Sequence, residues 1–277
     1  MIQNDYHKHC AKVDKMTKNR LRFWIIIALI VLATVVAGVD AAFAIIQHTT
    51  IETHTYTVSA QPTLVINNDT GSIAIQRGST NSAITISAIK HLRAFGIGSP
   101  PTIRYNQNGN TVTATAHSND SFSGLGSNNV DFAVTIPANA NLQIHTDTGL
   151  VTVNGISGIM SLTTNTGSIN ATQVTLSGHS MLTGTGGSIV FAGSIDPGGL
   201  YQFVTGTGSL NVTLPGNSSF QLDARTNTGS LNNNFVSVNV QHANTIGYEA
   251  RGNVGASATA RVILKTNTGS IDLNKGA

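Results

Sequence analysis

The sequence has almost no cysteine, little charge and few aromatic residues, and each shortage excludes something. The single cysteine, Cys10, lies near the N-terminus, so no disulfide can link the rest of the chain and packing alone must hold it. Charged residues make up 10% of the chain and aromatic residues 5%. From residue 51 onward nine basic residues balance nine acidic ones. A neutral domain of this kind has no electrostatic reason to bind nucleic acid, so no nucleic-acid partner is expected.

Sequence patterns that carry catalysis or bind cofactors are also missing. There is no Gly-x-Ser-x-Gly, no Walker phosphate loop, no His-Glu-x-x-His and no Gly-Gly-x-Gly-x-Asp repeat. The histidines after the N-terminal segment stand alone, without a second ligand type at metal spacing. They are His54, His91, His117, His145, His179 and His242. We therefore expect no catalytic residues, no cofactor and no metal site.

A short phrase that ends in a corner glycine occurs seven times. Most copies read Asn/Asp-Thr-Gly-Ser followed by Ile or Leu, and neighbouring copies from the second to the sixth are 18 to 21 residues apart. The last step is 40 residues, which predicts one degenerate copy in between. The corner glycines are Gly71, Gly149, Gly167, Gly187, Gly208, Gly229 and Gly269. A period near 20 with one turn signal per period predicts stacked β rungs.

Side chains around each corner alternate in character. Positions five and seven before the glycine are mostly apolar, whereas positions one and three are mostly threonine. Because alternate residues of a strand share a face, the threonines are expected to look inward and to form a hydroxyl ladder between rungs. The ladder that directly precedes the corners is Thr148, Thr166, Thr185, Thr207, Thr228 and Thr268. The residue two before the glycine is Asp, Asn or Gly, so Asp69 and Asp147 are interpreted as turn formers.

The repeat and the composition together predict an all-β fold. Thr, Val, Ile, Gly, Ser and Asn are common, and no helical periodicity is convincing beyond the N-terminal segment. We expect one β-solenoid-like stack of short strands, with rungs of about 20 residues, over residues 60–277. The part before residue 137 holds one full copy of the repeat but keeps strand patterning.

The N-terminal segment has the pattern of a membrane anchor. Residues 1–22 carry six Lys and Arg, and residues 23–46 are an apolar run long enough to cross a bilayer as a helix. Positive-inside bias predicts a cytoplasmic tail (1–22), a transmembrane signal-anchor helix (23–46), a polar linker (47–59) and an extracytoplasmic domain (60–277). Cleavage of a signal peptide after Ala44 is the alternative, because residues 42–44 read Ala-Phe-Ala.

The stretches Ile136–Leu142 (IPANANL) and Thr148–Gly155 (TGLVTVNG), with the later Thr-Gly-Ser-Ile copies, resemble a known family. It is the toast-rack domain, also named the "putative adhesin" domain, of bacterial envelope proteins whose function is unknown. The resemblance covers roughly residues 60–275. It implies a β-solenoid-like stack and a cell-envelope setting, and it supplies no catalytic residues.

These observations favour a non-enzymatic membrane-anchored module that binds an envelope glycan or a protein, or that organises the envelope. One alternative is a glycan-active enzyme whose acids, among them Asp120, Asp131 and Glu249, converge near the loops 91–101 and 118–129. Another is an ice-binding protein, because Thr-x-Thr arrays are typical of that class. The predicted inward direction of the threonines argues against ice binding.

Overall fold

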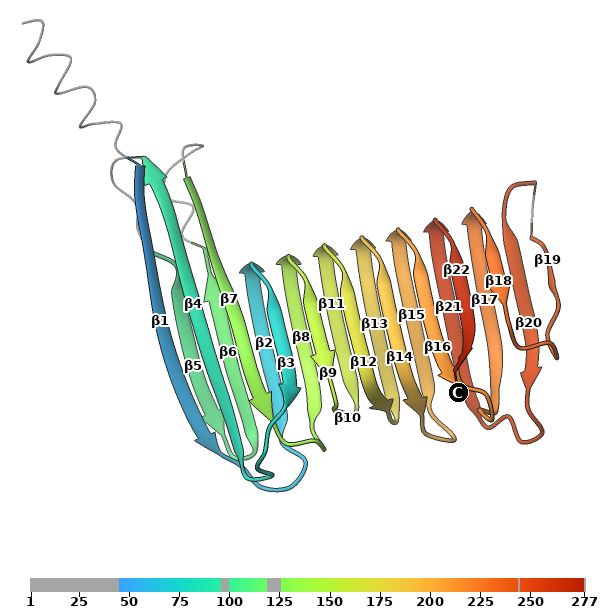
Figure 1. Ribbon diagram of the computed structural model, residues 1–277, viewed down its shortest axis with the longest axis horizontal. Helices are drawn as coiled ribbons and strands as arrows, with labels where there is room; N and C mark the ends of the chain where they lie inside the picture. Colours follow the sequence, from blue (N-terminus) through green and yellow to red (C-terminus); the bar gives the residue numbers. More distant parts are fainter. Residues whose placement is uncertain (1–44, 96–99, 119–125, 244, 277) are drawn as a thin grey trace, which may run out of the picture.

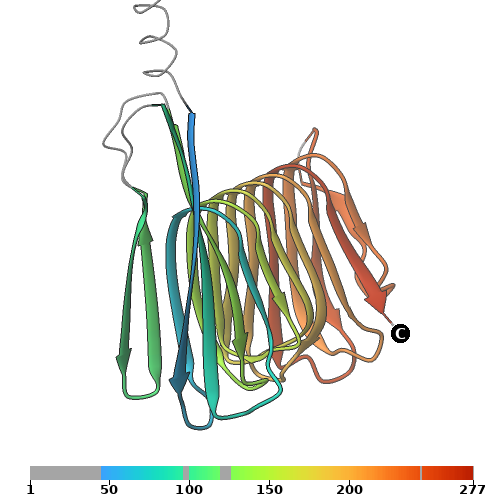
Figure 2. The ribbon, with the colours of Figure 1, turned by 60° about the vertical axis from the view of Figure 1, so that its left-hand side comes forward.

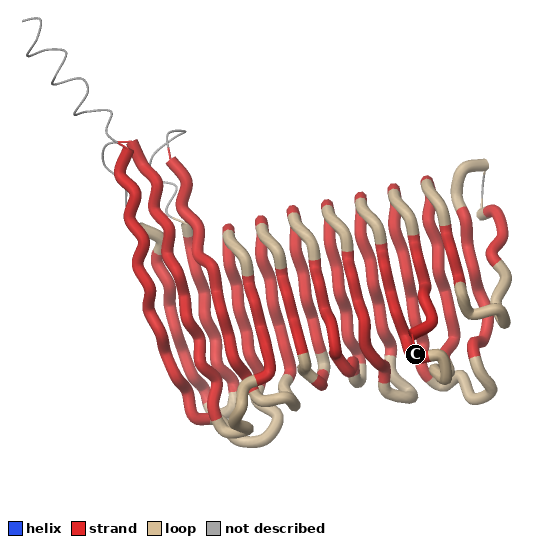
Figure 3. Tube along the Cα trace, in the orientation of Figure 1, coloured by secondary structure: helices blue, strands red, loops and turns tan. Residues whose placement is uncertain are grey.

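The structure, a computed structural model, describes residues 45–95, 100–118, 126–243 and 245–276. These residues form two 11-stranded sheets and no helix, so the all-β prediction is confirmed for them (Figure 1, Figure 3). Within these ranges there is accordingly no apolar helix of membrane-spanning length. The predicted tail and most of the predicted anchor, residues 1–44, lie outside the described residues. The last two residues of the predicted anchor helix, Ile45 and Ile46, instead begin strand β1 and pair with Phe95 and Ala94 of β4.

The two sheets, called A and B, face each other and both extend along the long axis of the molecule, as the rotated view in Figure 2 shows. In spatial order, sheet A contains β1 (Ile45–Thr57), β4 (Ala83–Phe95), β7 (Gly126–Ile136), β3 (Ile73–Arg77), β9 (Val151–Asn154), β12 (Ile169–Leu176), β14 (Ile189–Ile195), β16 (Leu210–Pro215), β22 (Ile271–Gly276) and β18 (Leu231–Asn233), with β10 (Ser157–Gly158) beside β12. Sheet B contains β19 (Val240–His242), β20 (Tyr248–Val254), β17 (Phe220–Thr228), β21 (Ala260–Thr268), β15 (Leu200–Thr207), β13 (His179–Gly186), β11 (Met160–Thr166), β8 (Asn141–Thr148), β2 (Thr63–Thr70), β6 (Thr111–His117) and β5 (Thr102–Asn108).

The hydrophobic core lies between the two sheets. Along β15, Tyr201, Phe203 and Thr205 are buried while the residues between them are partly exposed, which is the alternation expected of a strand with one core face. Phe203 meets Phe191 of β14 in the opposite sheet, with ring centroids 5.1 Å apart. Such aromatic pairs add stability beyond the area that they bury.

Each copy of the repeat supplies one strand to sheet B, a corner, and one strand to sheet A. All seven corner glycines have positive φ, between 124° and 155°. At Gly167 the amide donates to the carbonyl of Gly186 in the next rung, and a Cβ would overlap the carbonyl oxygen of Gly149 in the rung before. Glycine is therefore required at this corner both for its backbone angle and for the close approach of neighbouring rungs.

The threonines around the corners divide into two sets, which differs from the prediction of a wholly inward ladder. The six that were predicted to form the ladder are exposed: Thr148, Thr166, Thr185, Thr207, Thr228 and Thr268. Most of them stand where the strand ends and the chain leaves the core, so alternation no longer buries them. The inward set stands two residues earlier and consists of Thr146, Thr164, Thr205, Thr226 and Thr266.

Three of the inward threonines link neighbouring rungs. The hydroxyls of Thr205, Thr226 and Thr266 donate to the carbonyls of the corner glycines Gly187, Gly269 and Gly208, at 2.8, 2.9 and 3.1 Å. The hydroxyls of Thr146 and Thr164 are buried without a hydrogen-bond partner. The rungs near the C-terminus are thus tied together at their corners by bonds that the rungs of Thr146 and Thr164 lack, whereas in the first copy Asn68 makes such a bond to the carbonyl of Val130 at 2.9 Å.

The order of rungs in space departs from the order in the sequence at the C-terminal end. The final copy, β21 and β22, is inserted between the copy β15/β16 and the copy β17/β18, and it pairs in parallel with both. The chain between β18 and β21 forms β19 and β20. Strand β20 pairs antiparallel with β17, and β19 pairs antiparallel with β20. The 40-residue step of the repeat therefore does not contain a degenerate rung of the stack, because this segment turns back along its edge.

The N-terminal end is also closed by antiparallel strands. In sheet A, β7, β4 and β1 extend the stack beyond β3, and in sheet B the hairpin of β5 and β6 lies beyond β2. Residues 47–57, predicted as a polar linker, lie within β1, which pairs with β4 along its whole length. Open parallel edges would otherwise expose unpaired backbone groups.

Candidate functional site

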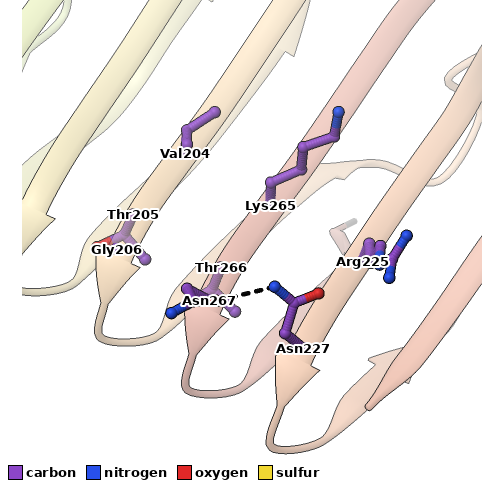
Figure 4. A pocket seen from close by; sticks show the side chains of 8 residues that line it. All are labelled: Val204, Thr205, Gly206, Arg225, Asn227, Lys265, Thr266 and Asn267. Atoms are coloured by element: carbon purple, nitrogen blue, oxygen red, sulfur yellow. Dashed lines mark hydrogen bonds between the residues drawn. The ribbon is translucent and has the colours of Figure 1, made fainter. Parts of the chain in front are cut away.

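A groove lies on sheet B over β15, β21 and β17, close to their corners (Figure 4). It has a volume of about 540 Å³. The residues that line it are Val204, Thr205, Gly206, Arg225, Asn227, Lys265, Thr266 and Asn267. In this surface β21 pairs directly with both β15 and β17, so residues that are 40 positions apart in the sequence stand on adjacent strands.

Two cations stand side by side in the groove. The register pairs Arg225 of β17 with Lys265 of β21, and Lys265 in turn with Val204 of β15. Arg225 is half-buried, and its Nε is buried without a hydrogen-bond acceptor. In the part of the chain that the structure describes, neither side chain has a carboxylate within ion-pair distance.

The acids nearest to Arg225 are engaged elsewhere. Glu249 of β20 faces Arg225 in the register, but its carboxylate accepts a hydrogen bond from Gln241 at 3.1 Å and lies 3.6 Å from Arg251. Asp223 pairs with Arg251 at 3.1 Å and with Arg261 at 3.7 Å. The hydrogen bond from Arg251 to Asp223 and the charges of Asp223 and Glu249 raise the pKa of Arg251. Asp223 and Glu249 thus form their ion pairs with Arg251 and Arg261, and neither forms one with Arg225 or Lys265.

Asparagine amides line the corner side of the groove. The Nδ2 of Asn227 donates to the Oδ1 of Asn267 at 2.8 Å, drawn as the dashed line in Figure 4. The amide nitrogen of Asn267 points away from Asn227, toward the strand that carries Gly206. Gly206 has no side chain to accept a hydrogen bond there, so the row of amides ends in a donor. In an earlier rung the equivalent donor, Asn165, reaches Asp147 at 2.7 Å.

The groove therefore presents a guanidinium, an ammonium and an amide N–H, all of them hydrogen-bond donors. Charged donors bind carboxylate, sulfate and phosphate oxygens through short, charge-assisted bonds. The arrangement is suited to holding an anion.

The acids considered for catalysis are not brought together. Asp131 lies on β7 and Glu249 on β20, near opposite ends of the molecule (Figure 1). Asp131 accepts hydrogen bonds from the amide and the hydroxyl of Ser72, at 2.7 and 2.8 Å, and pairs with His91 at 3.1 Å. Asp120 lies outside the described residues.

Three histidines that look isolated in the sequence have an aspartate partner. Besides His91, His145 lies 3.2 Å from Asp147, and His117 lies 3.5 Å from Asp69. Asp69 also accepts the amide of Ser118 at 2.9 Å, so this aspartate ties β2 to the residue after β6. Across residues 45–276, apart from the undescribed gaps, no three His, Cys, Asp or Glu side chains are grouped as a metal site.

Sequence reasoning missed Arg225 and Lys265, although a signal was present. Each stands four residues before its corner glycine, Gly229 or Gly269, in the outward column of the repeat. The same column holds Thr163, Thr183 and Val204 in the preceding copies. Aligning the copies on the corner glycine therefore predicts two cations in one column, but not that their strands are neighbours.

No protein-family model and no curated protein matches the chain. Among solved structures it is similar to a "putative cell adhesion protein" from Clostridium sporogenes, with 13% identity, a TM-score of 0.46, and coverage of 82% of this chain and 100% of the other. A "putative adhesin" from Bacteroides fragilis has 11% identity and a TM-score of 0.36 over 81% of this chain and 97% of the other. A "putative lipid binding protein" from Parabacteroides distasonis has 9% identity and a TM-score of 0.23 over 82% and 97%. The first two descriptions name adhesion proteins, the class that the sequence resembles.

Proposed function

We propose that the protein is a non-enzymatic adhesion or binding module of the cell envelope that holds an envelope ligand on sheet B. The observation that carries the proposal is the groove over β15, β21 and β17, where Arg225, Lys265 and Asn267 offer donors without partners. Unpaired donors in a groove are the ordinary means by which a binding site fixes a polar ligand.

The proposal includes a β-solenoid-like architecture and a membrane anchor. Strands of successive copies alternate between the two sheets and pair in parallel with their neighbours, which supports a solenoid. The proposed anchor lies in the apolar run before β1, with residues 1–22 in the cytoplasm and the β domain outside the cell, and it rests on the charge asymmetry of the sequence.

Two features support a binding role over hydrolysis. Asp131 and Glu249 are separated by most of the length of the stack, whereas glycoside hydrolysis needs two carboxyl groups about 5 to 10 Å apart. Asp131, Glu249 and Asp223 are each held by hydrogen bonds or ion pairs with neighbouring side chains. An ice-binding role gains no support, because the exposed threonines form a single row along the corners, interrupted by Gly186.

The test is adherence of cells that display the full-length chain. A non-adherent bacterium expressing it should bind surfaces coated with envelope polysaccharide more strongly than cells without it, and protease added outside should remove both the domain and the adherence. A tag at the N-terminus should survive the protease. Unchanged adherence across polysaccharide and protein coatings, with the domain intact at the surface, would contradict the proposal.

A further inference from the structure

We infer that the groove over β15, β21 and β17 binds an oxyanion of an acidic glycan, with Arg225 and Lys265 as its charged contacts. The inference rests on the proposed function and specifies the ligand class of the same site.

The electrostatics of the groove require an anion. Like charges on directly opposite residues of neighbouring strands destabilise a sheet, and Arg225 and Lys265 occupy such a pair. The nearby acids form their ion pairs with other cations, Asp223 with Arg251 and Arg261, and Glu249 with Arg251. An oxyanion bound by the guanidinium and the ammonium would offset both charges.

The donors also differ in geometry, which gives the site selectivity. Guanidinium is a planar fork that matches two oxygens of one acid group, whereas ammonium is a compact charge on a flexible stem. Asn267 adds an amide N–H on the corner side of the groove, where the row of asparagines stops at Gly206. An acid group can thus contact Arg225 or Lys265, and a hydroxyl can contact Asn267.

The surroundings of the groove favour a glycan over an acidic protein segment. Its walls consist of amides, hydroxyls and the small side chain of Val204, without the large aromatic anchors that dominate protein interfaces. The same corner position carries Asp147, Asn165, Asn267 and Asn227 in neighbouring or nearby rungs, about 4.8 Å apart per strand. A polar polymer can contact the adjacent amides of Asn267 and Asn227 on these two strands.

The experiment measures binding of the purified full-length chain, in detergent, to immobilised polymers at several salt concentrations. Polygalacturonate is compared with its methyl ester, and dextran sulfate with dextran, so that each acidic polymer has a neutral partner with the same backbone. Poly-glutamate tests an acidic polypeptide. The variants are Arg225→Gln and Lys265→Gln, with Lys275→Gln of sheet A as a control for the loss of one charge from the exposed surface.

We expect binding to at least one acidic glycan and not to its neutral partner, weakened about tenfold or more by Arg225→Gln or Lys265→Gln and unchanged by Lys275→Gln. The two acidic glycans distinguish a carboxylate from a sulfate ligand. Equal binding of acidic and neutral partners, insensitivity to both groove variants, or binding of poly-glutamate alone would each overturn the inference. Adherence of displaying cells that persists in Arg225→Gln and Lys265→Gln would overturn the inference and leave the proposed function standing.

Discussion

The middle of the stack and its C-terminal rungs share one backbone plan but differ in what they show to solvent. Residues 132–222 contain two charged residues, Asp147 and Asp196, whereas residues 223–276 contain eight. The inward residues are alike in both regions, with apolar side chains at the same positions and a threonine before most corners. The core therefore constrains one face of each strand, and the outer face is available for binding.

The two regions also differ in how their rungs are ordered. The middle rungs follow the sequence, from β8/β9 through β11/β12 and β13/β14 to β15/β16. The last two are exchanged in order, so Lys265 of β21 lies between Val204 of β15 and Arg225 of β17. The outward column that holds Thr163, Thr183 and Val204 in the regular rungs therefore carries two adjacent cations in the last two.

The largest expected effect tests whether the stability of the regular rungs depends on glycine at their corners. Gly167→Ala should destabilise the protein by more than about 4 kcal/mol, because the new Cβ overlaps the carbonyl of Gly149 and φ is 143°. Gly109, in the hairpin of β5 and β6, has a φ of 57° and no atom within 4 Å of a Cβ, so Gly109→Ala should cost about 1 kcal/mol. Chemical denaturation of both variants checks the difference, and equal losses would show that packing between corners is unimportant.

A second prediction separates the core face from the outer face of a single strand. Phe203→Ala should cost about 3–5 kcal/mol, because Phe203 is fully buried against Phe191. Val204→Ala, one residue further on the outer face, should change stability by less than about 0.5 kcal/mol. Urea midpoints of the two variants give the comparison, and similar midpoints would contradict the assignment of faces.

The third prediction uses a buried tyrosine of the middle region. Burial, with the nearby charge of Asp196, raises the pKa of Tyr201 to about 12, and its hydroxyl donates to the carbonyl of Asp196 at 2.7 Å. Because the pKa of Tyr201 is higher in the folded than in the unfolded protein, its buried, protonated hydroxyl contributes stability that is complete below about pH 10 and is lost as the pH rises toward 12. The loss should reach about 2–3 kcal/mol.

Tyr201→Phe should accordingly be less stable at neutral pH and should lose less stability between pH 10 and 12. Thermal melts at pH 8, 10 and 11 measure how steeply the stability of each protein, Tyr201→Phe and the original, falls with pH. Burial and a hydrogen bond to Glu52 also raise the pKa of Tyr105 in β5, so some alkaline sensitivity should remain in the variant. Parallel slopes for the two proteins would refute the role of Tyr201.

The smallest effect sharpens the contrast between bonded and unbonded threonines. Thr226→Val removes a hydroxyl that donates to the Gly269 carbonyl, and it should cost about 1 kcal/mol. Thr164→Val removes a buried hydroxyl without a partner, so it should be neutral or slightly stabilising. Denaturation curves for the pair decide, and a larger loss for Thr164→Val would reverse the interpretation.

The sequence alone determined the local plan of this protein. Alternation of apolar and polar residues indicates strands, and the glycine of each copy marks a corner that has positive φ in the structure. These features depend on neighbours within a few residues, which is why a single sequence reveals them. The predicted inward position holds for Thr226 but not for Thr228, because the distance from the core matters as well as the alternation.

The tertiary structure decided which rungs are neighbours. The pairing of β21 with β15 and β17, the inclusion of residues 47–57 in β1 and the contact of His117 with Asp69 each join segments that are distant in the sequence. Copies of the repeat present nearly the same edges, so local pattern does not distinguish one stacking order from another. The choice depends on contacts between distant segments, among them the antiparallel pairs of β1, β4 and β7 at one end and of β17, β20 and β19 at the other.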